Sequence, residues 1–350
     1  MAGTTDTPRR PATVHAAAAL AVEYADRLVL RTVRDVHRAV SRRTFSMTGP
    51  ASLPSRYAHD AVSGSVYGIV GASLRATGAV LRHADRRGHG RALDTRPAGR
   101  RVAAVVNGLV GESLQETRHP MAITMAARKD GYDVTDLAAA YANAGGDVVV
   151  FLHGLVEDDE SWTRGAATSG GTYADRLERD TGWTPVTMRY NSGLPIARNG
   201  ELLSDWLNRL VAGWPTAVRR IAFVGHSMGG LVALAACRSG SAGDLAWAPL
   251  VRHVVCLGTP HLGAPLERAV HWGSRGLLAF PESAPFATIL ETRSRGIRDL
   301  GRGDPDCMPL PGASYHCVSA GLPGPVGLIL GDLLVRRTSA TGRIAGATSR

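Results

Sequence analysis

A serine between two glycines, in the pattern Gly225, Ser227 and Gly229, is the strongest sign of chemistry in this sequence. It follows a short apolar run, residues 221–224, and precedes an alanine-rich stretch of helix-forming residues, 231–237. This order predicts a strand, a tight turn and a helix, because small residues on either side of the serine let strand and helix approach closely. A serine at that apex presents its hydroxyl above a helix N-terminus, where negative charge is stabilised. The pattern favours a nucleophile over a plain glycine turn.

This stretch, Gly225-His226-Ser227-Met228-Gly229-Gly230, resembles the nucleophile elbow of the α/β-hydrolase fold, in its lipase and esterase branch. The resemblance covers the chain from about residue 101 onward. It implies a mostly parallel sheet with helices on both faces. A basic region, expected to be helical, precedes this domain in the sequence. It also implies that Gly225, His226 and Gly229 support the serine.

The same resemblance implies an oxyanion hole. In hydrolases of this fold a His-Gly pair follows the strand whose loop donates one backbone N–H group, and here His153 and Gly154 follow the apolar run 147–152. Leu155 matches the donor position, and Met228 supplies the second N–H group. Losing one such donor typically costs on the order of 3 kcal/mol of transition-state stabilisation. His153 is otherwise read as a turn histidine with a structural hydrogen bond, since the backbone carries the catalytic role.

The resemblance also implies an acidic residue, and Asp332 stands in a matching Gly-Asp context after the strand predicted at 315–319. The family order is serine, acid, histidine, yet no histidine follows Asp332. His261, in a Gly-Thr-Pro-His stretch typical of lipase-like hydrolases, lies at the correct end of a strand and is an alternative base. His316 lies at the wrong end. Three explanations compete: loss of a C-terminal histidine loop and last helix, recruitment of His261, or a non-catalytic relative. We favour the first.

Charge divides the chain near residue 100. Residues 1–100 carry 16 Arg against 7 Asp or Glu, a net charge of +9, whereas residues 101–350 are close to neutral. Lys129 is the only lysine, which indicates a coding bias toward arginine. The high isoelectric point of about 10.1 therefore gives no argument for nucleic-acid binding. We expect a helical region with a linker over 1–100 and the hydrolase domain over 101–350.

A long helix is predicted over residues 12–43, with valines at three- and four-residue steps. Arginines fall on the other side: Arg27, Arg31, Arg34 and Arg38. One interpretation is a basic amphipathic helix on an anionic membrane. The other, to which we give more weight, is a packed helix with a solvated arginine face. A second apolar stretch, residues 61–81, contains several glycines and Arg75, which argues against a membrane span.

Several further expectations concern local structure. Residues 102–106 read as a strand that ends at an Asn107-Gly108 turn, 121–128 as an edge strand, and 133–144 as a helix. Three acidic residues after the oxyanion loop read as surface residues: Asp158, Asp159 and Glu160. The four cysteines have no metal-ligand spacing, and nothing indicates an oxidising compartment.

The sequence predicts a serine hydrolase that acts on carboxylic esters, with lipid esters favoured, through an acyl-enzyme on Ser227. No metal or organic cofactor is implied. An acyltransferase is the chemically adjacent alternative, because an alcohol then replaces water. A membrane-surface or scaffold protein that has lost turnover is the alternative from another class. The expected location is the cytoplasm. The expected partner is a small-molecule ester or lipid substrate, and peripheral contact of the basic helix with an anionic membrane is the less favoured alternative.

Overall fold

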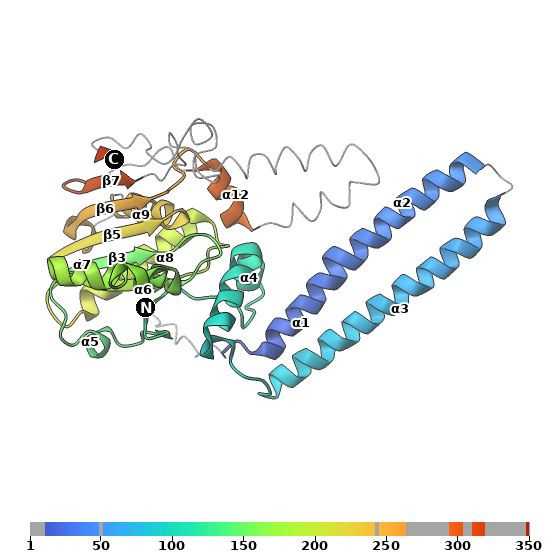
Figure 1. The fold of residues 1–350 in the computed structure, drawn as a ribbon, viewed down its shortest axis with the longest axis horizontal. Helices are drawn as coiled ribbons and strands as arrows, with labels where there is room; N and C mark the ends of the chain where they lie inside the picture. The colour runs from blue at the N-terminus through green and yellow to red at the C-terminus, as the bar shows by residue number, and fades with distance from the viewer. Residues whose placement is uncertain are drawn as a thin grey trace, which may run out of the picture. The chain divides into compact units, whose positions relative to one another are not determined.

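The computed structural model describes residues 11–48, 52–241, 245–263, 294–303, 310–318 and 348–349 (Figure 1). The described residues up to Arg96 form one compact unit, and those from Pro97 onward form another. We call them the hairpin unit and the sheet unit. The division lies four residues before the boundary that the charge distribution predicts.

The hairpin unit consists of two long helical arms. The first arm runs through α1 (Val14–Tyr24), a π-helical turn η1 (Ala25–Leu30) and α2 (Arg31–Thr48), and it lies against α3 (Leu53–Arg86) (Figure 1). Thr13 caps α1, because its side-chain oxygen accepts a hydrogen bond from the N–H group of Ala16 at 3.1 Å. The helix predicted over 12–43 is confirmed. None of the described helices is long and apolar enough to cross a bilayer.

Small and polar residues fill much of the seam between the two arms. A Cβ added at Gly71 would lie 3.3 Å from Asp26 Oδ1, and Asp26 in turn pairs with Arg75 at 3.6 Å. Farther along, the ring of His37 contacts Tyr67 Oη at 3.0 Å and the ring of His59 at 3.2 Å. Large apolar side chains of the arms are instead exposed, as in Val29, Val62 and Ile69. The two arms therefore bury little apolar surface against each other.

The sheet unit is built on a mixed, mostly parallel sheet. Its described strands are β1 (Ala126–Lys129), β2 (Tyr132–Asp133), β3 (Asp147–Leu152), β4 (Thr184–Arg189), β5 (Arg220–His226), β6 (Val251–Leu257), β7 (Ser314–Val318) and β8 (Thr348–Ser349). They lie in the order β2-β1-β4-β3-β5-β6-β7-β8. Only β1 runs antiparallel to its neighbours, β2 and β4, and the other pairs are parallel. The predicted fold class is confirmed.

Helices cover both faces of this sheet, because alternate residues of each strand point to opposite sides. Val150 and Phe223 belong to a large buried cluster with residues of α8 (Ile196–Gly213) and α9 (Met228–Ser241). Phe151 and Val224 belong to a second cluster on the other face, beside Trp162 and α7 (Tyr173–Thr181). The short remaining elements are η3 (Leu93–Thr95), α5 (Leu137–Ala140), η4 (Asp159–Thr163), α6 (Ala166–Ser169), η5 (Ala248–Leu250) and α12 (Arg295–Arg302).

The strand predicted at 102–106 was wrong, since these residues lie in α4 (Pro97–Glu116). The buried positions of α4 recur at helical spacing, as in Ala103, Asn107 and Leu114. Asn107 is a fixed core residue and not a turn, because its side chain donates hydrogen bonds to Ala103 O at 2.8 Å and Met121 O at 2.7 Å. The edge strand predicted over 121–128 is in part wrong: only the shorter strand β1 forms there, and it lies inside the sheet between β2 and β4. Of the helix predicted over 133–144, the structure has the short helix α5.

Candidate active site

Ser227 lies on the turn between β5 and α9, as the sequence predicts for a strand–turn–helix element. Its φ of 51° is in the left-handed region, which costs an ordinary residue roughly 1–3 kcal/mol. Two backbone hydrogen bonds hold it there. Its N–H group donates to Leu257 O at 2.8 Å, and its carbonyl accepts from the N–H group of Gly230 at 3.2 Å. Ser227 is partly exposed, whereas residues 221–225 of β5 and 228–230 of α9 are buried.

Close approach of neighbouring atoms explains the glycines around Ser227: backbone atoms at Gly225 and Gly229, and a side chain at Gly230. A Cβ at Gly225 would lie 2.4 Å from the backbone nitrogen of Gly230, and one at Gly229 would lie 2.2 Å from Leu152 O. A Cβ at Gly230 would lie 2.0 Å from Thr259 Oγ1. Side chains do not fit at such distances, so these positions require glycine.

The parallel pairing of β3 and β5 brings the predicted oxyanion loop beside the serine. Leu152 is the register partner of Gly225, so the residues that follow both strands emerge at the same sheet edge. A Cβ at Gly154 would lie 3.4 Å from Ser227 Cβ. Leu155 follows Gly154 directly, and Met228 is the first residue of α9. The N–H groups of a first helical turn have no acceptor within their own helix, so such groups are free to bind an anion.

Glu157 joins this loop to the turn. Its Oε2 accepts a hydrogen bond from the N–H group of Gly154 at 2.9 Å and lies 2.9 Å from Nδ1 of His226. Its Oε1 pairs with Arg164 at 2.8 Å. Burial by itself raises the pKa of this carboxyl group, but His226, Gly154 and Arg164 outweigh burial and lower the pKa to about 2. The Glu157 carboxylate therefore connects the loop at Gly154 to the turn at His226, next to Ser227.

His153 is a structural residue in the described site. Its ring is fully buried and stacks on Tyr190 with ring centroids 4.2 Å apart. Nδ1 lies 2.8 Å from Gly154 O, and Nε2 accepts a hydrogen bond from the N–H group of Tyr190 at 3.3 Å. Burial lowers the pKa of His153 to about 4, so the ring is neutral near pH 7. These contacts favour a role in fixing the loop over a role in proton transfer.

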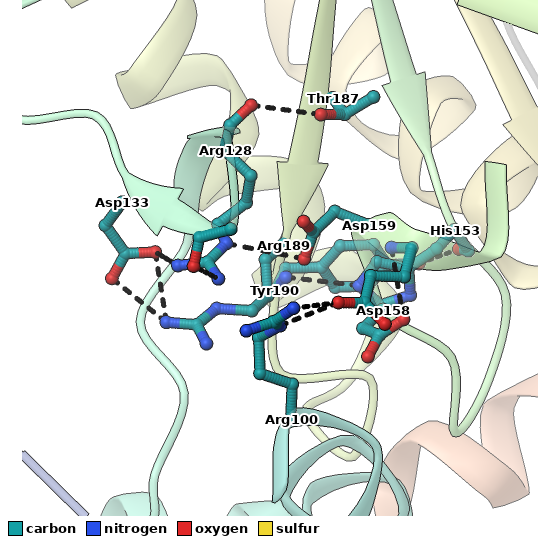
Figure 2. Close-up of polar contacts among 11 residues, drawn as sticks. Arg100, Arg128, Asp133, His153, Asp158, Asp159, Thr187, Arg189 and Tyr190 are labelled. Carbon is teal, nitrogen blue, oxygen red and sulfur yellow. Dashed lines mark hydrogen bonds and ion pairs between the residues drawn. The ribbon is translucent and has the colours of Figure 1, made fainter. Parts of the chain in front are cut away.

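The prediction that Asp158, Asp159 and Glu160 lie on the surface was wrong for the two aspartates, which are 4% and 8% exposed, and Glu160 is only partly exposed. Figure 2 shows a cause for Asp159, which an arginine from β1 reaches. Asp158 instead accepts a hydrogen bond from the N–H group of Glu160 at 3.1 Å. Arg128 lies 3.4 Å from Asp159, and Glu160 pairs with Arg100. Local sequence shows only three adjacent acids in a loop, whereas the arginines that pair with Asp159 and Glu160 come from distant positions.

The network continues through the edge of the sheet. Asp133 accepts from Arg128 at 2.8 Å and from Arg189 at 3.0 Å, and both guanidinium groups are nearly buried (Figure 2). Burial raises the pKa of Asp158, and the neighbouring charges of Asp159 and Glu160 raise it further. Arg128 and Asp159 are the pair in which both side chains are nearly buried, and removing one member of a buried ion pair typically costs about 3–5 kcal/mol. This pair therefore holds the loop against β1.

His261, the alternative base, lies after β6 and is only 2% exposed. Its Nε2 lies 3.6 Å from Cys317 Sγ, and its Nδ1 has no hydrogen-bond partner within the described chain. A hydrogen bond with Cys256 lowers the pKa of the Cys317 thiol; burial opposes this, and His261 adds to it. Asp332 lies outside the described residues. The structure therefore brings Ser227 together with Gly154, His226 and Glu157; sequence reasoning missed Glu157, because a single loop glutamate carries no pattern.

The sheet order, the strand–turn–helix at Ser227 and the adjoining loop are those of an α/β-hydrolase fold. Residues 143–272 match the profile of the PGAP1-like alpha/beta domain, an α/β-hydrolase family. This match spans β3 to the segment after β6 and includes the serine turn. It supports membership of the superfamily. A comparison with curated proteins finds no match.

Among solved structures, the chain is similar to the Bacillus licheniformis lipase BlEst2 in its propeptide form, with 20% identity and a TM-score of 0.45 over 58% of this chain and 44% of that one. It is similar to a metagenomic carboxyl esterase, with 20% identity and a TM-score of 0.36 over 58% and 62% of the two chains. It is also similar to the phospholipase PlaB of Legionella pneumophila, with 15% identity and a TM-score of 0.36 over 56% and 46%. The chain thus spans less than two thirds of each of these proteins.

Proposed function

We propose that this chain is a serine hydrolase that acts on carboxylic esters, with lipid esters as the favoured class. Ser227 Oγ attacks the ester carbonyl, the alcohol leaves, and water then releases the acid from the acyl-enzyme. The N–H groups of Leu155 and Met228 hold the oxyanion, and Asp332 orients a histidine that takes and returns the proton. His261 is the alternative base. The observation that carries the proposal is the left-handed φ of Ser227, 51°, on a strand–helix turn beside Gly154.

The strained backbone at Ser227 and the nearby N–H donors support a catalytic role for this turn. A residue held in a sparsely populated backbone region persists only where the surroundings fix it, and such residues cluster at active sites. The three glycines that the turn requires, together with the backbone bonds from Leu257 and Gly230, supply that constraint. Two preorganised N–H donors would contribute about 3 kcal/mol each to transition-state stabilisation.

Hydrolysis of p-nitrophenyl esters with acyl chains of two to twelve carbons tests the proposal. We expect Ser227→Ala to lower kcat/KM by about 10³-fold or more, because only oxyanion and binding effects remain. Ser239→Ala is the matched control, since Ser239 lies on the same helix and its Oγ donates to Ala235 O at 3.2 Å. That variant should retain wild-type activity.

Equal activity of the wild type and Ser227→Ala would contradict the proposal and favour the non-catalytic alternative. Adding a primary alcohol to the same assay separates hydrolysis from acyl transfer. Hydrolysis predicts free acid as the main product, whereas a predominance of the new ester would replace the hydrolase by the acyltransferase.

A further inference from the structure

A groove of about 440 Å³ runs between α2 and α3 in the hairpin unit. Four guanidinium groups line it: Arg31, Arg34 and Arg38 from α2, and Arg75 from α3. The three arginines of α2 recur at three- and four-residue steps, so they share one side of that helix. Four cations therefore surround one hollow.

Glycines form the floor of the groove. Packing within the hairpin accounts for Gly71, because a Cβ there would lie 3.0 Å from Arg75 Nη1 and 3.3 Å from Asp26 Oδ1. It does not account for Gly64 or Gly68, where a Cβ would have nothing within 4 Å. Glycine in a helix interior costs about 1 kcal/mol relative to alanine. These two glycines leave space in the groove, although packing within the hairpin does not require glycine at either position.

The charges in the groove are only partly compensated. Arg34 pairs with Asp35 at 3.0 Å, and Arg75 pairs with Asp26 at 3.6 Å. The side chains of Arg31 and Arg38 belong to exposed residues and make no ion pair or hydrogen bond with any other residue of the described chain. Asp26 is the one acidic residue among those that line the groove. An excess of positive charge is therefore directed at a space that a ligand can enter.

We propose that this groove binds a phosphate-bearing anion. A guanidinium group donates two parallel N–H bonds to phosphate oxygens, which makes arginine well suited to this ligand. Arg31 and Arg38 are about 10 Å apart along the helix axis, which matches a phosphate with a short attached group. The headgroup of an anionic lipid and a soluble phosphate ester present the same oxygens. Both are therefore sources of the ligand.

The test uses the full chain and two probes. Vesicles of phosphatidylglycerol in phosphatidylcholine, compared with phosphatidylcholine alone, report on lipid binding by sedimentation, and titration calorimetry with glycerol 3-phosphate reports on the soluble ester. We expect binding to at least one probe. Arg31→Gln with Arg38→Gln should raise Kd at least tenfold. Arg42→Gln with Arg86→Gln removes the same charge outside the groove and should change Kd less than threefold.

A second variant separates a shaped site from general attraction between charges. Gly64→Leu with Gly68→Leu fills the floor, keeps the net charge and adds better helix formers. It should weaken binding at least tenfold while the far-ultraviolet circular dichroism stays helical. Undiminished binding by this variant, equal loss in the Arg42 and Arg86 control, or no binding of either probe by the wild type would overturn the proposal.

The vesicle assay and the calorimetric titration together distinguish the two sources of the ligand. Binding to anionic vesicles without binding to glycerol 3-phosphate assigns the site to a lipid headgroup, and binding to both assigns it to phosphate esters generally. The groove lies in the hairpin unit and does not depend on the proposed hydrolase. Ser227→Ala should therefore bind both probes as the wild type does.

Discussion

The two units of this protein are held together in different ways. In the sheet unit, Val150 and Phe223 are completely buried in a continuous apolar cluster. In α3 of the hairpin unit, Ile69 is 66% exposed, while Gly71 and Gly78 are buried. Burial of apolar area dominates stability where it occurs. The sheet unit should therefore be sensitive to changes of side-chain volume, whereas the hairpin unit should tolerate them and depend on its polar seam.

The largest difference is expected between two glycines. Gly230→Val should destabilise the sheet unit by more than about 4 kcal/mol, because a Cβ there would lie 2.0 Å from Thr259 Oγ1, and Thr259 is fully buried. Gly64→Ala in α3 should stabilise the hairpin by about 0.5–1 kcal/mol, since its Cβ meets nothing within 4 Å. Urea unfolding followed by circular dichroism measures both, and a similar loss in the two variants would contradict the comparison.

Shortening an apolar side chain should cost more stability in the sheet unit than in the hairpin unit. Phe223→Ala should cost about 3–5 kcal/mol, because it removes a fully buried ring from the main cluster. Ile69→Ala should change stability by less than about 0.5 kcal/mol, because the side chain is mostly in solvent. Urea midpoints of the two variants against wild type provide the measurement. A loss above 2 kcal/mol for Ile69→Ala would mean that a partner covers this face.

A pH effect of intermediate size is expected from His153. Its folded pKa of about 4 lies below the ordinary value of 6.5, so between these values the unfolded chain binds a proton that the folded chain does not. Stability should therefore fall by about 2 kcal/mol from pH 7 to pH 5. His153→Phe keeps the ring beside Tyr190 but does not titrate, so its unfolding free energy should change less over this interval. Equal pH dependence in the two proteins would exclude His153 as the cause.

Glu157→Gln tests through turnover how the loop is joined to the serine turn. The variant loses the charge that joins Gly154 to His226, so we expect kcat to fall about 10- to 100-fold with little change in KM. Because the pKa of Glu157 is about 2, the ratio to wild type should be constant from pH 5 to pH 8. Glu178→Gln, an exposed acid on α7, is the control. A rise in KM alone would assign Glu157 to substrate binding.

Much of the sheet was predictable, because β3 and β6 contain the apolar runs 148–152 and 254–257, and β5 carries the glycine pattern that ends a strand at a tight turn. The apolar run in α4 led to a wrong strand prediction, since periodicity does not separate a short buried helix segment from a strand. Contacts between residues far apart in the sequence could not be predicted from local patterns. Glu157 meets His226 across 69 positions, and nothing local marks either residue as the partner of the other.

The central claim is that Ser227 is an activated nucleophile. Treatment with a fluorophosphonate, followed by proteolysis and mass spectrometry, tests it directly. We expect one adduct, on the peptide that contains Ser227, with no adduct in Ser227→Ala. Absence of any adduct on the wild type, or an equal adduct in the variant, would contradict it.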